Sequence, residues 1–160
     1  MNTAGQDATL LRRPHPRFVL CLPGMECPFC SIARGELAAS VVLRDEQVVA
    51  FMDTRPVFKG HVLVAAREHV PDLLELPRTL LEPLFFAVQR IARAMETGLA
   101  ADGSFVAVNT KISQSVPHLH VHVVPRRKGD GLRGFFWPRT KYDSDAEREG
   151  YAQRIRAALG

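Results

Sequence analysis

The chain has 160 residues, of which 46% are apolar and 24% are charged, and its formal net charge is +4. This length suits one ordinary domain with a sizeable core, and the composition excludes an intrinsically disordered protein. Residues 1–17 lack the apolar centre of a signal peptide and no stretch is long enough to span a bilayer, so we expect a cytoplasmic protein without a membrane partner.

The excess of positive charge favours anionic ligands in general. No basic and aromatic pattern typical of an RNA-binding sheet is present, so small anions such as nucleotides fit better than nucleic acid. Three cysteines are too few for a secreted disulfide framework. Two of them form Cys27-Pro-Phe-Cys30, and in a reducing compartment such a pair more often indicates metal or redox chemistry.

The N-terminal arm, residues 1–24, mixes Gly, Pro and Arg without periodicity and predicts irregular structure. A short helical turn is predicted from Phe29 to Arg34, because Gly35 suits a helix C-terminus. Runs rich in β-forming residues follow and predict three strands, at 40–43, 47–52 and 61–66. Arg44-Asp45-Glu46 separates the first two runs, which is the pattern of an antiparallel hairpin.

From Arg78 to Leu99, apolar side chains recur at spacings of three and four, which predicts one long amphipathic helix. Its apolar positions are Leu81, Leu84, Phe85, Val88, Ile91, Ala92 and Met95. Gly98 and Asp102-Gly103 are predicted to end the helix, and 105–108 and 119–124 to form two further strands. Three strands, a helix and two strands are the order of an α+β fold.

Beyond Pro125 the chain is basic and glycine-rich, and Phe135-Phe136-Trp137-Pro138 follows. This segment predicts a loop, which is either a solvated connector or an edge that attracts anions. Residues 143–159 predict a terminal helix, with Ser144 and Glu147 as a capping box. We expect residues 25–127 to form one domain, and the loop and helix of 128–160 to pack on it.

The stretch from His118 to His122 has the period of a strand. Because successive side chains of a strand point to opposite faces, His118, His120 and His122 share one face, while apolar residues occupy the other. Pro117 and Pro125 are predicted to mark where regular pairing begins and stops. A solvated face that happens to carry histidines is the alternative, although the chain has only six. Imidazoles so arranged suit phosphate chemistry or metal binding.

The run Ser115-Val116-Pro117-His118-Leu119-His120-Val121-His122-Val123-Val124 resembles the signature of the histidine-triad (HIT) family of nucleotide hydrolases and transferases, His-φ-His-φ-His-φ-φ with φ apolar. Three other segments carry the resemblance: Cys-Pro-Phe-Cys at 27–30 with Arg34-Gly35-Glu36, Phe51-Met52-Asp53, and Lys59-Gly60-His61-Val62-Leu63-Val64. The resemblance implies a HIT-like fold, with a helix packed on a mainly antiparallel five-stranded sheet, and a homodimer.

The resemblance also implies the roles of catalytic residues. His120 would be the nucleophile that carries the nucleotidyl group. His122 would hydrogen-bond the phosphoryl oxygens or the bridging atom, Ser115 would donate to the departing group, and Gln114 would bind phosphate.

The resemblance implies a nucleotide site around these residues. Asp53 would accept hydrogen bonds from the ribose hydroxyls, the alternative being a turn aspartate before Pro56. Asn109 would contact the phosphate or sugar. A purine base would be enclosed by four apolar residues, each of which alone would more often be core: Phe29, Ile32, Phe51 and Met52.

Family members with a Cys-x-x-Cys pair can hold zinc, and the resemblance implies Cys27, Cys30, His69 and His118 as the ligands. Four thiolate and imidazole ligands make a closed tetrahedral site, which is structural and not catalytic. His61 is a rival for the fourth position. A free cysteine pair in a turn is the alternative to Zn2+.

We therefore expect an enzyme that cleaves a nucleoside monophosphate from a phosphoramidate, a dinucleoside polyphosphate or a related substrate through a nucleotidyl-histidine. Two alternatives stay open, a nucleotidyl or phosphorolytic transferase and a nucleotide-binding module with little turnover. The loop from Asn109 to Ser115 is shorter than the glycine-rich loop of many members, and the chain extends past the tail of the smallest members. These departures leave the leaving group unpredicted.

Overall fold

The computed structural model describes residues 27–132 and 141–159, and it divides after Lys128 into two compact units. The predicted N-terminal arm and the aromatic run at 135–138 lie outside the described residues. In the first unit the elements are, in chain order, α1 (Pro28–Arg34), β1 (Val41–Arg44), β2 (Val48–Met52), β3 (Val62–Ala66), a 3-10 turn (Leu73–Glu75), α2 (Arg78–Leu99), β4 (Gly103–Val108) and β5 (His120–Arg126).

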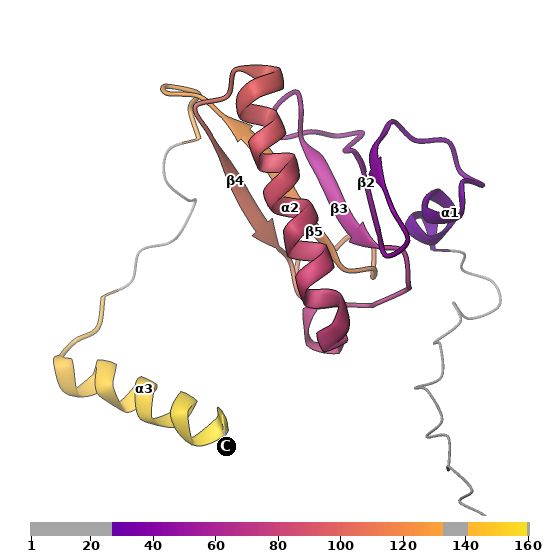
Figure 1. Cartoon of the computed structure of the whole chain (residues 1–160). Helices are drawn as coiled ribbons and strands as arrows, with labels where there is room; N and C mark the ends of the chain where they lie inside the picture. The colour runs from indigo at the N-terminus through magenta and orange to yellow at the C-terminus, as the bar shows by residue number, and fades with distance from the viewer. Residues whose placement is uncertain (1–26, 133–140, 160) are drawn as a thin grey trace, which may run out of the picture. The chain divides into compact units, whose positions relative to one another are not determined.

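The five strands form one antiparallel sheet in the order β1-β2-β3-β5-β4. Figure 1 shows α2 running across the sheet, with α1 beyond β2. The predicted α+β architecture is therefore confirmed. Because the hairpins and the crossover to β5 bring distant segments together, β3 and β5 become neighbours in the middle of the sheet.

Alternation along each strand divides the core into two clusters, one on each face of the sheet. The cluster under α2 contains Val64, Leu84 and Val121, which have no exposed surface. The cluster on the other face joins α1 to β2 and β3 through Phe29, Phe51 and Leu63 among others. Truncating a side chain as deeply buried as Leu84 to alanine typically costs about 2–5 kcal/mol, so α2 is a main source of stability.

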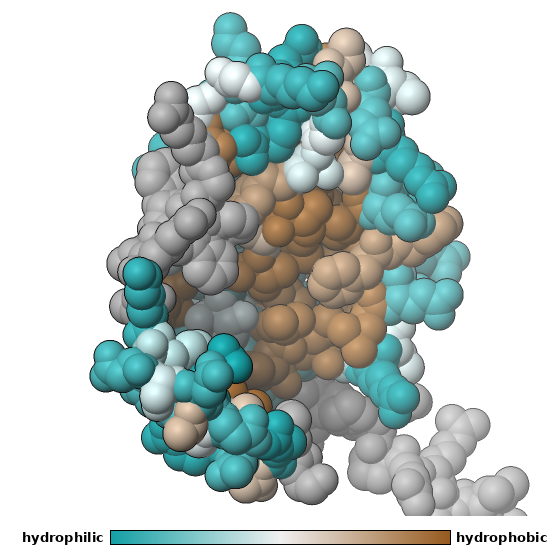
Figure 2. All heavy atoms as spheres, turned by 90° about the vertical axis from the view of Figure 1, so that its left-hand side faces the viewer, coloured by the Kyte–Doolittle hydropathy of each residue, from teal (hydrophilic) through white to brown (hydrophobic). Residues whose placement is uncertain are grey.

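The long helix has the predicted bounds, but its buried stripe is shifted. Leu81 and Phe85, predicted to face the core, are 41% and 43% exposed, while Leu80 and Ala87 are buried instead. Figure 2 shows apolar side chains gathered on the side of the molecule that β4 presents. Since β4 ends the strand order, this side carries a sheet edge with exposed apolar neighbours.

The helix ends at the predicted residue, Leu99, where Ala100 takes the left-handed conformation at φ 50° and the Ala101 N–H donates to the Met95 carbonyl at 3.2 Å. One predicted boundary is wrong. Pro125 does not stop β5. Pro125 pairs with Ser104 of β4. The pairing of β5 with β3 ends at Val123, so the N–H that Pro125 lacks removes no hydrogen bond to β3.

The loop between β2 and β3 is fixed at its C-terminal end by Gly60. This glycine has φ 101°, and a Cβ there would lie 2.6 Å from Leu99 Cδ1 and 3.1 Å from Pro125 Cγ. The positive φ disfavours every residue with a side chain, and a Cβ would in addition displace the end of the Leu99 side chain. The loop is thereby fixed against the end of α2 and against β5.

The second unit contains α3 (Asp145–Leu159). Its predicted capping is confirmed, because the Glu147 N–H donates to Ser144 Oγ at 3.1 Å and Glu147 Oε2 accepts from the Asp143 N–H at 2.7 Å. Packing of this helix on the sheet domain stays a prediction. None of the described helices is both long and apolar enough to cross a membrane.

Candidate active site and metal centre

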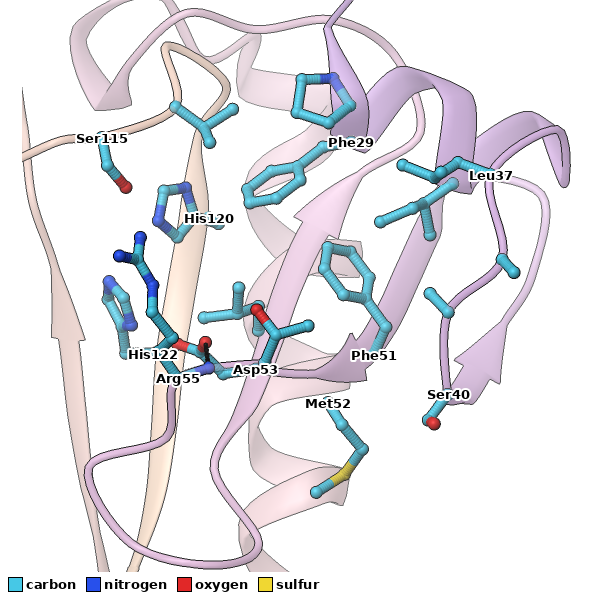
Figure 3. Close-up of a pocket in the computed structure, with 17 residues that line it drawn as sticks. Phe29, Leu37, Ser40, Phe51, Met52, Asp53, Arg55, Ser115, His120 and His122 are labelled. Atoms are coloured by element: carbon cyan, nitrogen blue, oxygen red, sulfur yellow. Dashed lines mark hydrogen bonds between the residues drawn. The ribbon is translucent and has the colours of Figure 1, made fainter.

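The three histidines of the triad share one face of the sheet, as predicted, and this is the face that α1 covers. His118 is 0% exposed and His120 5%, because α1 and the residues around it cover them. The Phe29 ring stands edge-on to the His120 ring, with centroids 5.1 Å apart, and both are visible in Figure 3. The alternative of a solvated histidine face is therefore excluded.

A pocket of about 670 Å³ opens beside His120 and His122. Most of the residues predicted to bind or transform a nucleotide line it: Phe29, Ile32, Phe51, Met52, Asp53, Ser115, His120 and His122. Sequence reasoning missed Leu37, Leu63 and Arg55, which also line the pocket. The volume lies in the ordinary range for a small-molecule site, and the apolar part of the lining adjoins α1.

Asn109 and Gln114, predicted to contact the substrate, are not among the pocket-lining residues. Gln114 accepts the Lys111 N–H at 3.0 Å and donates to the Pro71 carbonyl at 2.6 Å, while Asn109 Nδ2 donates to the Ser113 carbonyl at 3.2 Å. These bonds brace a loop in which Lys111 and Ser113 have positive φ. In this arrangement both amides hold the loop that presents Ser115.

A single carbonyl determines which ring nitrogen of His120 carries the proton. The His120 Nδ1 atom lies 2.6 Å from the His118 carbonyl oxygen, and because a carbonyl only accepts, Nδ1 carries the proton. In the neutral ring Nε2 then has a free lone pair. This is the form that a nucleophilic imidazole requires.

His122 has the opposite arrangement, which it owes to His61. His61 Nδ1 lies 3.3 Å both from the Val57 N–H and from Asp53 Oδ2, and His61 Nε2 lies 3.0 Å from His122 Nδ1. In the tautomer in which Nδ1 accepts from Val57, the His61 proton sits on Nε2 and points to His122. His122 Nδ1 therefore accepts, and its Nε2 carries a proton. His61 was considered only as a zinc ligand; the signal for its true neighbour is the register that places Leu63 opposite His122.

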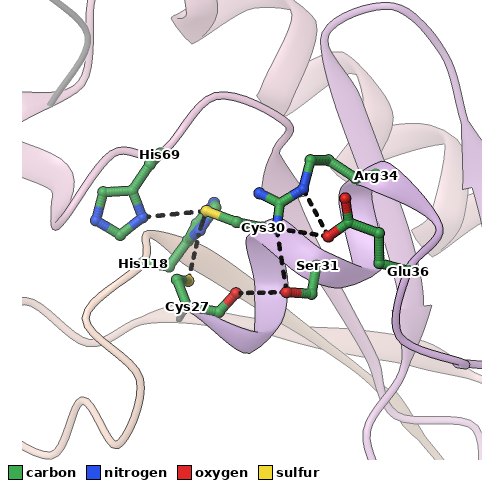
Figure 4. Close-up of polar contacts among 7 residues, drawn as sticks. All are labelled: Cys27, Cys30, Ser31, Arg34, Glu36, His69 and His118. Atoms are coloured by element: carbon green, nitrogen blue, oxygen red, sulfur yellow. Dashed lines mark hydrogen bonds and ion pairs between the residues drawn. The ribbon is translucent and has the colours of Figure 1, made fainter. Parts of the chain in front are cut away.

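The candidate metal centre is built around His118. Its Nε2–H donates to the Ala66 carbonyl at 2.8 Å, which leaves Nδ1 free, 3.3 Å from Cys27 Sγ and 3.5 Å from Cys30 Sγ (Figure 4). A backbone carbonyl on the second ring nitrogen is the usual partner of a metal-binding histidine.

The two cysteines reach this point because α1 begins between them. Cys27 is the N-cap residue, Pro28 opens the helix, and Cys30 lies one turn later on the same side. His69 Nδ1 lies 3.4 Å from Cys30 Sγ, and the four ligand atoms lie within 4.8 Å of one another. Two buried thiols and two imidazoles fit the donor set of tetrahedral zinc.

Burial lowers the pKa of four histidines in and around the site. Burial, with smaller contributions from neighbouring imidazoles, lowers the pKa of His118 and of His122 to about 4. Burial also lowers the pKa of His69 and of His61, although the Asp53 carboxylate, 3.3 Å from His61 Nδ1, opposes the shift of His61. Neutral rings are what both metal binding and the assigned hydrogen bonds need.

Comparison with known proteins extends these observations. The family model for the HIT domain matches residues 34–129. An uncharacterized HIT-like protein of Mycobacterium tuberculosis is 36% identical, with 84% of this chain and 94% of that protein covered. The asymmetrical bis(5'-nucleosyl)-tetraphosphatase of Schizosaccharomyces pombe is 33% identical, with 59% of this chain and 53% of that enzyme covered.

Solved structures of HIT proteins are also similar to this chain. A HIT family member from Bacillus subtilis has a TM-score of 0.77 and is 32% identical, with 85% of this chain and 99% of that chain covered. A zinc-bound histidine triad protein from Mycobacterium smegmatis has a TM-score of 0.64 and is 37% identical, with 82% and 96% covered. By family model, sequence identity and fold, this chain belongs to the HIT domain family.

Proposed function

We propose that this protein is a nucleotide hydrolase that cleaves a nucleoside monophosphate from a phosphoramidate, a dinucleoside polyphosphate or a related substrate. The observation that carries the proposal is a pair of contacts in one pocket: His120 Nδ1 lies on the His118 carbonyl, which leaves a lone pair on Nε2, and His122 Nδ1 lies on His61 Nε2, which in the assigned tautomer leaves a proton on His122 Nε2. One ring is suited to attack phosphorus and the other to hydrogen-bond its oxygens. The activity of the Schizosaccharomyces pombe relative supports the same class.

The reaction has two steps. In the first, His120 Nε2 forms a bond to phosphorus as the bond to the leaving group breaks. His122 Nε2–H donates to a phosphoryl oxygen, Ser115 donates to the departing atom, and that atom takes its proton from water. In the second step water attacks the same phosphorus, the bond to His120 breaks, and the nucleoside monophosphate leaves as a proton passes to solvent.

The nucleoside would bind along the lining between α1 and β2. A purine base would contact Phe29, Ile32 and Phe51, which pack together on the α1 face of the sheet, while Met52 also lines the pocket but packs against the cluster under α2. Asp53 Oδ1 already accepts the Arg55 N–H at 2.7 Å, which aims the carboxylate, and its remaining lone pairs would accept the ribose hydroxyls. Asn109 and Gln114 would act by bracing the phosphate-side loop.

Zinc held by Cys27, Cys30, His69 and His118 would be structural. When bound, it would cross-link the start of α1 to the segments before β5 and after β3. Zinc would not take part in catalysis. The peptide carbonyl of His118 orients His120, whereas the His118 ring faces the cysteines.

The test is a comparison of wild type, His120→Ala and His122→Ala on a panel of adenosine substrates, with and without added phosphate. His120→Ala should lose at least on the order of a thousandfold in turnover, because the covalent step has no nucleophile. His122→Ala should lose on the order of a hundredfold, as for one transition-state hydrogen bond. Phosphate should not become the acceptor.

A labelled nucleotide trapped on wild type by an acid-free quench, and missing from His120→Ala, would support the intermediate. Mononucleotide binding measured by calorimetry should be similar in both proteins, since base and ribose contacts do not involve His120. Label persisting on His120→Ala, or no turnover by wild type of any substrate in the panel, would refute the proposal.

A further inference from the structure

Arg55 is a pocket residue for which neither the triad nor the metal centre provides a role. It lies in the loop after β2 and lines the same pocket as His120 and His122. In Figure 3 its side chain extends from the loop toward those two rings. Among the described residues that line the pocket, it is the only one with a permanent positive charge.

The backbone at Arg55 is fixed, whereas its guanidinium is available. Asp53 Oδ1 accepts the Arg55 N–H at 2.7 Å, and Pro56 restricts the preceding residue to extended conformations. Within the described part of the chain, the Arg55 side chain forms no hydrogen bond or ion pair. Asp53, the acidic residue of the pocket, is engaged by the Arg55 backbone and lies 3.3 Å from His61.

The position of Arg55 relative to His120 indicates which part of a substrate it would meet. His120 is 5% exposed, while Arg55 is an exposed residue. In an in-line displacement the leaving group departs on the side opposite the nucleophile, and with a buried nucleophile that side faces solvent. An exposed guanidinium in the same pocket would therefore lie beside the leaving group.

We propose that Arg55 selects substrates whose leaving group carries phosphate, by donating two hydrogen bonds to the phosphate oxygens beyond the phosphorus that His120 attacks. This rests on the proposed function. A guanidinium presents its N–H groups as a fork that matches phosphate, whereas an amine leaving group offers it no oxygen. Dinucleoside polyphosphates are thereby favoured over phosphoramidates.

The neutral surroundings strengthen this assignment. His122 is neutral near pH 7, since burial and neighbouring imidazoles lower its pKa to about 4. A polyphosphate entering the pocket would then depend on Arg55 for a full positive charge within the described lining. Because Arg55 is exposed, its contribution should weaken as salt concentration rises.

The experiment compares wild type, Arg55→Met and Arg55→Lys on diadenosine tetraphosphate and on adenosine phosphoramidate. Arg55→Met should lose on the order of tenfold or more in kcat/KM on the tetraphosphate, as expected for hydrogen bonds to a charged group, and less than about threefold on the phosphoramidate. Arg55→Lys should restore part of the loss. Arg93→Met, which removes an exposed charge from α2 outside the pocket, is the matched control and should change neither value.

Equal losses on both substrates, or no loss on the tetraphosphate, would overturn the assignment. If wild type turns over no substrate of the adenosine panel, the proposed function fails, and binding then tests Arg55 separately. In that case Arg55→Met should raise the Kd of adenosine tetraphosphate on the order of tenfold and leave that of adenosine monophosphate unchanged. Equal Kd values in wild type and variant would refute the role of Arg55.

Discussion

The Nε2 atom of His61 lies 3.0 Å from the Nδ1 atom of His122, and His61 is 2% exposed. Because the other nitrogen of His61 accepts the Val57 N–H, this contact determines which nitrogen of His122 carries the proton. In the proposed reaction His61 is thus a positioning residue that acts through His122.

Replacing His61 should slow the chemistry without weakening substrate binding. His61→Leu removes the donor to His122 Nδ1, so His122 is free to take the wrong tautomer, and kcat should fall on the order of tenfold while KM changes little. His61→Gln keeps an N–H near the same position and should recover much of the rate. Steady-state kinetics on any turned-over substrate provides the measurement; a loss in His61→Gln as large as that in His61→Leu would indicate a merely structural role.

The metal centre predicts one zinc per chain. Protein purified without chelator should contain zinc at a stoichiometry near one by elemental analysis, and the double variant Cys27→Ser with Cys30→Ser should contain none. Because binding energy at such a site adds to folding stability, the double variant should also have a lower Tm. Cys21→Ser, which alters a cysteine outside the described residues, is the control. Full zinc content in the double variant would exclude this ligand set.

The stability of metal-free protein should fall as the pH decreases from about 6.5 to about 4. In the folded state the pKa values of His118 and His122 are about 4, whereas an unfolded histidine titrates near 6.5. Between these values the unfolded state binds protons that the folded state does not, so the free energy of unfolding falls by up to about 1.4 kcal/mol per pH unit for each residue.

Urea denaturation at several pH values measures this dependence. His122→Asn removes one of the two groups, so its free energy of unfolding should vary less steeply with pH than that of wild type. Identical slopes in both proteins over this interval would contradict the assigned shift of His122.

The edge strand β4 predicts a homodimer. Val106 of β4 and Phe85 of α2 are 42% and 43% exposed, and the apolar side shown in Figure 2 belongs to this edge. An exposed apolar edge is a natural site for a second copy. Val106→Lys and Phe85→Glu should therefore shift the mass measured by light scattering toward the monomer. Phe86→Glu, near the β1–β2 turn, is the control, and a monomeric wild type would refute the prediction.

Local patterns were enough to predict much of this structure. The bounds of α2 and the sharing of one face by His118, His120 and His122 follow from periods of 3.6 and 2 that the chain carries in each segment. Gly35 likewise caps α1 at φ 83° as predicted. These features depend on neighbours within a few residues.

The predictions that failed or fell short depend on distant partners. The amide of Gln114 is occupied by the Pro71 carbonyl, 43 residues away, and His61 meets His122 only through the register of β3 on β5. Phe85 was counted as core because periodicity identifies an apolar face and not what covers it. The sequence indicated most of the candidate site residues, but not which of them touch.

Gly60 gives the site a vulnerability at a distance from any substrate. The loop that it anchors carries Asp53, Arg55 and His61, so a side chain at residue 60 would displace the proposed ribose ligand, the pocket cation and the partner of His122 together. A genetic screen for inactive variants should therefore recover Gly60 alongside the triad, although residue 60 lines no part of the pocket. Such variants would resemble catalytic mutants in an assay while arising from a steric fault behind the active site.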